Sequence, residues 1–259
     1  MSARRILALA AWLGATLTGS TSAQSLASRV AQVKDGTVQF AFASRPDACS
    51  GPDGTFSGNI QIQCRAGKEW VCEYGPALVA LTFHGGDLVA VRSTIARWWR
   101  RNPPADTKDL GQVPVREATD VLLHLAATSR GVGSHLIAAA MFADPDSVTL
   151  WPDLIRIARR TDVPRKTRQA AVFWVGQAAS NKATEGLADL LDDEDQDRGV
   201  REQAVFALSQ RPNGKGVPAL LKAARTHRDP AIRRKALFWL GQSDDPRALA
   251  LLEELLAKP

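Results

Sequence analysis

The sequence predicts an α+β protein of two domains, in which a small antiparallel β domain precedes an α-solenoid of helical hairpins. Apolar residues recur with a period of two from about residue 36 to residue 94, and with a period near 3.6 after residue 113. One apolar sequence motif, which we call the repeated phrase, also occurs three times in the second half of the sequence, as in proteins built from stacked helical units. The predicted segments are a signal peptide over 1–23, the β domain over 24–96, a linker over 97–112 and the solenoid over 113–259.

The first residues have the pattern of an export signal. Arg4 and Arg5 precede an apolar run from Ile6 to Leu17, which is shorter than the ~18 residues of a membrane span. Small residues at 21–23 then predict cleavage before Gln24, and the alternative is a short anchor that stays attached. We therefore expect a periplasmic or secreted protein with no membrane insertion after cleavage.

The net charge of +6 gives little indication of a partner. Two of these charges, Arg4 and Arg5, belong to the predicted signal, and the remainder is too small to predict nucleic-acid binding. The hydrophobic content of 45% is that of an ordinary folded protein, which excludes a disordered or fibrous chain.

Three cysteines lie close together and none follows them. In an oxidising compartment two of them are expected to form a disulfide, and we favour Cys49 with Cys72. Cys64 stands in an alternating pattern and is either free or replaces Cys49 as the partner of Cys72. No paired C-x-x-C spacing is present and His84 is the one histidine nearby, so the pattern does not predict a zinc site.

The β domain is predicted to contain about four strands. Alternation occurs over 37–44 and again over 59–64, and residues 77–94 read as a hairpin around Gly85 and Gly86. The linker then begins with arginines and tryptophans and continues into Pro103 and Pro104. The cluster either packs between sheet and helices or forms an interaction surface for anions and aromatic rings; its members are Arg97, Trp98, Trp99, Arg100 and Arg101.

Helical periodicity predicts helices over 115–131, 134–145 and 147–160, after which the repeated phrase begins. Its copies align on Phe173, Phe206 and Phe238, at spacings of 33 and 32 residues. Each copy is followed by a second apolar helix, over 184–191, 216–225 and 246–256. The first helix of each unit has a broad apolar arc, as expected for a helix that is packed from several sides.

Two kinds of polar residue recur in register with the phenylalanines. Glutamines follow them, and arginines precede them within the apolar arc; the sets are Gln177, Gln210 and Gln242, and Arg168, Arg201 and Arg233. A charge in that arc must be paired or reach water. Asp197 and Asp229 stand four residues before an arginine, so we predict a carboxylate–guanidinium ladder running from unit to unit that fixes their register. The alternative is that the arginines bind an anionic ligand.

The aspartate, the arginine and the apolar positions around them resemble HEAT repeats, in particular the short bacterial type of phycobilisome lyase-related chains. The matching residues are Asp197, Val200, Arg201, Ala204 and Leu208 in one unit, and Asp229, Ile232, Arg233, Ala236, Leu240 and Gly241 in the next. The resemblance covers about 162–256 and leaves the predicted sheet outside it. It implies a scaffold that binds protein partners.

No catalytic or phosphate-binding motif stands out, and the four histidines show no metal-ligand spacing. The acidic stretch over 192–197 is either a solvated loop or a weak calcium site. We therefore predict an exported, non-catalytic HEAT-repeat scaffold that binds protein and requires no cofactor. The alternative is an enzyme or a small-ligand or anion-binding protein on a HEAT-like fold, similar to a lyase or a glycosylase.

Overall fold

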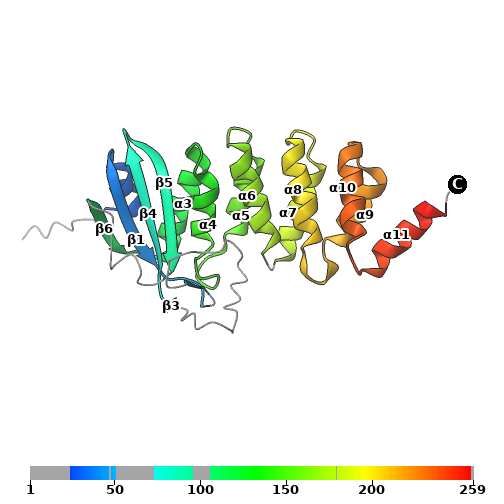
Figure 1. Cartoon of the computed structure of the whole chain (residues 1–259), viewed down its shortest axis with the longest axis horizontal. Helices are drawn as coiled ribbons and strands as arrows, with labels where there is room; N and C mark the ends of the chain where they lie inside the picture. Colours follow the sequence, from blue (N-terminus) through cyan, green and yellow to red (C-terminus); the bar gives the residue numbers. More distant parts are fainter. Residues whose placement is uncertain (1–23, 47, 51–72, 96–105, 179, 258–259) are drawn as a thin grey trace, which may run out of the picture.

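The computed structural model describes residues 24–46, 48–50, 73–95, 106–178 and 180–257. A small sheet lies at one end, and helices follow it side by side in an elongated array that finishes with the C-terminal helix (Figure 1). Among the described residues, no helix has the length and apolar character needed to cross a membrane.

Four strands form the main sheet, in the order β5-β4-β1-β6. The strands are β1 (Gly36–Phe42), β4 (Ala77–His84), β5 (Asp87–Ile95) and β6 (Thr107–Gln112). β1 pairs with β4 and β4 with β5 in antiparallel register, whereas β6 runs parallel to β1. The sheet is therefore mixed, and the expectation of a purely antiparallel sheet was wrong.

The parallel strand β6 comes from the end of the expected linker over 97–112. Of its six residues only Leu110 is buried, so it lacks the alternating apolar pattern by which a strand is recognised. It is held at the sheet edge by backbone pairing with β1 and by a 3.0 Å hydrogen bond from the Gln39 amide to the Asp109 carboxylate.

The hairpin predicted at Gly85 and Gly86 is present between β4 and β5. Both glycines have positive φ, +60° and +87°, which a two-residue turn of this kind requires. Their amides donate to the loop after the first helix, Gly85 to the Asp35 carboxylate and Gly86 to the Lys34 carbonyl. A separate pair joins β2 (Cys49–Ser50) to β3 (Glu73–Tyr74), and the strand expected over 59–64 lies outside the described residues.

A short helix, α1 (Leu26–Ala31), precedes the sheet and was not predicted. Leu26 and Val30 are buried, and the Leu26 amide donates to the Glu117 carboxylate of the first array helix. Arg29 donates to the Leu110 carbonyl of β6 at 3.0 Å. Helix α1 therefore connects the sheet edge to the helical array.

The array consists of α3 (Val115–Thr128), α4 (Gly133–Ala140), α5 (Trp151–Arg159), α6 (Arg165–Gly176), α7 (Asn181–Asp192), α8 (Arg198–Ser209), α9 (Val217–Thr226), α10 (Pro230–Leu240) and α11 (Pro246–Leu256). A short 3-10 turn, η1 (Pro212–Gly214), precedes α9. The helices lie in two rows: α6 packs between α4 and α8, and α8 between α6 and α10, while α5 packs against α3 and α7 and α11 against α9. The helices of the three repeated units are those that the phrase predicted.

Most of the buried apolar residues of sheet and helices form one continuous cluster that extends from Leu26 to Leu251, while Ala41, Leu78 and Ala80 form a small separate cluster in the sheet. The large cluster passes through the strands, where Phe40 and Phe42 are fully buried, and into the array without a break. Helix α4 contacts β5 directly. The expected boundary between a β domain and a helical domain therefore does not correspond to a gap in the core.

Candidate functional site

The interaction surface predicted in the linker lies outside the described residues; it comprises Arg97, Trp98, Trp99, Arg100 and Arg101. Of the cysteines, Cys49 is in β2 opposite Tyr74, and both Cys64 and Cys72 also lie outside. The disulfide between Cys49 and Cys72 and the state of Cys64 stay predictions.

The arginine in the first repeated helix reaches the following unit. Arg168 is only 4% exposed, and its guanidinium donates to the Val163 carbonyl at 3.0 Å and to the Gln196 amide oxygen at 3.1 Å. A third donor contacts the carboxylate of Asp197, the residue that immediately precedes α8. A buried guanidinium with three acceptors is satisfied and needs no ligand.

The corresponding contact between the second and third repeated units is longer. Arg201 approaches the Asp229 carboxylate at 3.8 Å, and Arg198 donates to the same carboxylate at 2.8 Å. Asp229 caps α10 by accepting from the Ala231 amide, and this bond, helped by Arg198, holds the pKa of Asp229 below its usual value. Each arginine thus meets the aspartate at the start of the next unit.

The third arginine ends the series. Arg233 donates to the carbonyls of His227 at 2.7 Å and Arg228 at 3.2 Å, both in the loop before its own helix. The structure therefore brings Arg168 to Asp197 and Arg201 to Asp229, and leaves Arg233 on backbone acceptors.

Sequence reasoning missed Arg211, which lies in the second copy of the phrase, five residues after Phe206. It is 3% exposed and donates to the Gly176 carbonyl at 2.9 Å, the Ser180 carbonyl at 2.8 Å, the Thr184 hydroxyl at 2.9 Å and also the Ala178 carbonyl. Burial lowers the pKa of Arg211. The sequence does mark Arg211 as unusual, because the other two copies of the phrase have a small residue at the equivalent position, Ala178 and Ser243.

Aromatic rings connect the repeated units along the row of first helices. The rings of Phe173 and Phe206 are stacked with centroids 6.4 Å apart, and Phe206 meets Trp239 at 5.1 Å. Phe173 and Phe206 are half-buried, whereas Phe238 is 57% exposed. The exposed glutamines Gln177, Gln210 and Gln242 end the same helices. Together with the three phenylalanines they form a surface that we call the phenylalanine–glutamine face.

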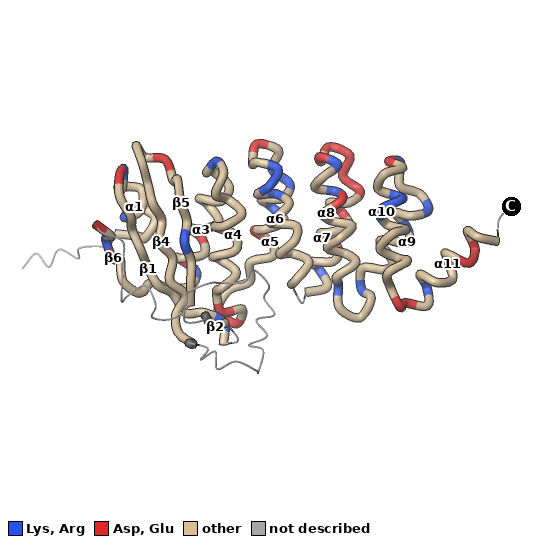
Figure 2. The backbone as a smooth tube through the Cα atoms, viewed as in Figure 1, with Lys and Arg blue, Asp and Glu red and all other residues tan. Residues whose placement is uncertain are grey.

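The acidic stretch over 192–197 connects α7 to α8 and is the most acidic part of the array (Figure 2). Three of its five carboxylates have cationic partners: Asp192 pairs with Lys222 at 2.6 Å, Glu194 with Arg228 at 2.7 Å, and Asp197 with Arg168. Across the described ranges, no group of three or more histidine, cysteine or acidic side chains is placed to hold a metal ion.

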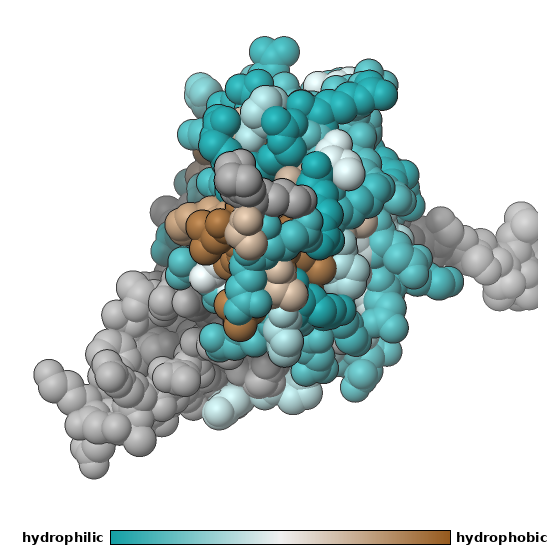
Figure 3. All heavy atoms as spheres, turned by 90° about the vertical axis from the view of Figure 1, so that its right-hand side faces the viewer, coloured by the Kyte–Doolittle hydropathy of each residue, from teal (hydrophilic) through white to brown (hydrophobic). Residues whose placement is uncertain are grey.

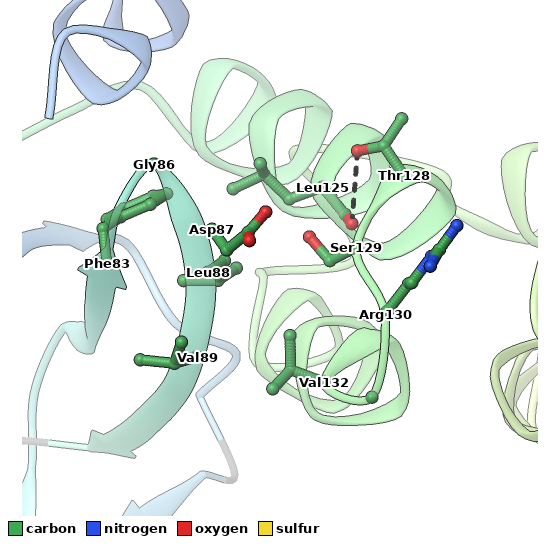
Figure 4. A pocket seen from close by; sticks show the side chains of 11 residues that line it. Phe83, Gly86, Asp87, Leu88, Val89, Leu125, Thr128, Ser129, Arg130 and Val132 are labelled. Carbon is green, nitrogen blue, oxygen red and sulfur yellow. Dashed lines mark hydrogen bonds between the residues drawn. The ribbon is translucent and has the colours of Figure 1, made fainter. Parts of the chain in front are cut away.

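The described residues line clefts at both ends of the first half of the array, and the linings of two of them bear on catalysis. One of about 770 Å³ lies between the β4–β5 hairpin and the α3–α4 turn, where the Asp87 side chain points toward Ser129 (Figure 4). The other, of about 480 Å³, is lined mainly by apolar side chains such as Met141, Trp151 and Trp174. Neither lining contains a nucleophile together with a histidine base, so neither has the arrangement of a covalent catalytic site.

Asp245 caps α11 by accepting a hydrogen bond from the Arg247 amide. Its pKa is lowered to about 2, first by side-chain hydrogen bonds from Arg247 and then by the Arg247 amide. The charged form therefore stabilises the fold above the ordinary aspartate pKa, and this contribution is lost as pH falls through about 2. In an Arg247→Gln variant we expect the pKa to rise but to stay below its ordinary value, because the amide still donates. A carboxyl-carbon NMR titration measures both, and an unchanged pKa in the variant would contradict the assignment.

These features define a helical-repeat protein with a small mixed sheet at one end. A family model described as HEAT repeats matches residues 194–259, which contain α8 to α11. HEAT repeats generally serve as scaffolds for protein interaction. No curated protein matches the chain.

Proposed function

We propose that the chain is an exported, non-catalytic scaffold that binds a protein partner through its helical array. The observation that carries this proposal is the phenylalanine–glutamine face, where the same two side-chain types recur on α6, α8 and α10. Its glutamine amides both donate and accept, so they suit the backbone and polar side chains of a partner, and its rings add apolar area. The buried arginines have structural acceptors, which favours a packing role for them over anion binding.

The partner is best sought by site-specific photo-cross-linking in the producing cell. A cross-linking amino acid at Gln177 or Gln210 is expected to capture the same protein, and one at Glu185, exposed on α7 in the other row, to capture none. The captured protein is then purified and its affinity measured. A Gln177→Arg, Gln210→Arg double variant should weaken binding at least tenfold, whereas Glu185→Arg should leave it unchanged. Equal binding by both variants would refute this choice of surface.

Export has its own prediction. The protein from an envelope or culture fraction is expected to begin at Gln24, as measured by intact mass and amino-terminal sequencing. A Leu9→Arg variant places a charge in the apolar run over 6–17 and should accumulate in the cytoplasm with residues 1–23 still attached. Recovery of the wild-type chain outside the cytoplasm with its first residues retained would instead favour the uncleaved anchor.

A further inference from the structure

The end of the array bears exposed apolar side chains from its last two helices. On α10, Phe238 is 57% exposed, and on α11 Leu249 is 58% and Leu256 is 87% exposed, with Leu252 half-buried between them. Leu249, Leu252 and Leu256 follow the spacing of one helical stripe. Figure 3 looks onto this end and shows apolar residues gathered near its centre. We call these four residues the end face.

Inside the array, the equivalent surfaces are covered by the next pair of helices. The Phe206 ring is covered by Trp239 of the following unit, at a centroid distance of 5.1 Å. Helices α5, α7 and α9 each pack extensively against the first helix of the next unit, which is α6, α8 and α10 in turn. Among the described residues the main packing partner of α11 is α9, and α11 slants away from α10 (Figure 1). Within the described residues, no further helix pair covers the end face, which resembles the inter-unit surfaces inside the array.

We propose that a second copy of this chain covers the end face, so that two arrays meet end to end about a two-fold axis. The end face cannot stack on the opposite inter-unit surface of another copy, because β5 of the sheet packs against α4 there. A two-fold contact instead presents the same surface from both copies, as in most homodimers. Each end face would then find apolar and aromatic side chains of the kind that cover Phe206 within the chain.

Charge selects one of the two possible orientations. Arg234 and Lys235 lie beside Phe238 on α10, while Glu253 lies between Leu252 and Leu256 on α11. The described residues provide none of these three side chains with an ion pair. A two-fold axis running between the two helices places α10 of one copy over α11 of the other, so that basic side chains meet an acidic one. The perpendicular axis would place α10 over α10 and bring like charges together.

The size of the face predicts the strength of the contact. Even if packed side by side, two helices of 11 residues would present a surface of at most roughly 16 by 20 Å, well below the ~800 Å² that each partner contributes to a standard stable interface. We therefore expect weak association that increases with protein concentration.

The test is sedimentation equilibrium of the mature chain from about 10 μM to about 1 mM. The wild type is expected to form a concentration-dependent dimer. Leu256→Glu and Phe238→Glu should each weaken it at least tenfold, and their exposure means that neither should disturb folding, which circular dichroism checks. Val89→Glu is the matched control, since Val89 is 52% exposed on β5, far from the end face, and it should leave the dimer unchanged.

A charge exchange then tests the orientation. Arg234→Glu and Glu253→Arg should each weaken the dimer, and their combination should restore much of the lost association, because the opposite charges face each other again across the axis. A monomer over the whole concentration range overturns the proposal. So does a dimer that responds equally to Val89→Glu and Leu256→Glu, or a charge-exchanged pair no stronger than either single variant.

Discussion

Replacing Gly216 with alanine is expected to destabilise the fold by about 3 kcal/mol or more. Gly216 precedes α9 and lies against the end of α8. A Cβ atom there would stand 2.0 Å from the Leu208 carbonyl oxygen and 2.6 Å from its carbon. Both are backbone atoms, so no side-chain rotation removes the clash, and α9 must move away from α8. Urea denaturation followed by circular dichroism measures the loss.

Gly241 provides the control for Gly216. It follows α10 at an ordinary φ of −67°, and a Cβ there would meet its nearest neighbours at 3.5 Å, which is normal van der Waals contact. Gly241→Ala is therefore expected to change the free energy of unfolding by no more than about 0.5 kcal/mol. If both variants lost the same stability, the effect would come from glycine as such and the close approach of α8 and α9 would be refuted.

The repeated helices could be predicted because their signal is redundant. Each first helix has fully buried apolar residues at a helical period, for example Ile232, Ala236 and Leu240, and the unit is written three times in register. Phe238 lies outside this buried set and is 57% exposed.

The parallel strand could not be predicted, for a physical reason. β6 forms because the edge of β1 that does not pair with β4 offers backbone hydrogen-bonding groups to it. The sequence of β6 itself is mostly polar. Pairing of this kind depends on where the chain returns after residue 95, which local periodicity does not encode. The same holds for the shared core, since the contact of α4 with β5 joins segments far apart in the sequence.

That the repeated arginines would need acceptors could be predicted from the sequence, whereas the particular acceptor of each arginine could not. An arginine in an apolar arc requires acceptors, and two aspartates were available in the right register. The sequence does not distinguish an aspartate four residues earlier from the one that begins the next unit. The structure selects the latter, since Arg168 reaches Asp197 and Arg201 reaches Asp229. Arg233 lies on α10, the last first helix of a unit in the described chain, and donates to backbone carbonyls instead.

Arg211 shows how a single residue joins two units without an ion pair. Two of its acceptors, the Gly176 and Ala178 carbonyls, lie at and just after the carboxyl end of α6, where carbonyls carry the negative end of the helix dipole. A third is the Ser180 carbonyl, which precedes α7 and also accepts from the Ala183 amide. The fourth is the Thr184 hydroxyl on α7. Because Arg211 itself follows α8, it holds α6, α7 and α8 in one arrangement.

Arg211→Met should therefore destabilise the fold by about 2–4 kcal/mol, because the apolar side chain leaves buried carbonyls without donors. Arg211→Lys should recover only part of this loss, since an ammonium group cannot reach acceptors spread over a planar fork. Arg228→Met is the control: Arg228 pairs with Glu194 while 83% exposed, and its loss should be within about 0.5 kcal/mol. Urea midpoints at equal slope rank the three variants. If Arg211→Met were no more destabilising than Arg228→Met, the carbonyls would not depend on this guanidinium, and the junction of α6, α7 and α8 would have to be held by apolar packing alone.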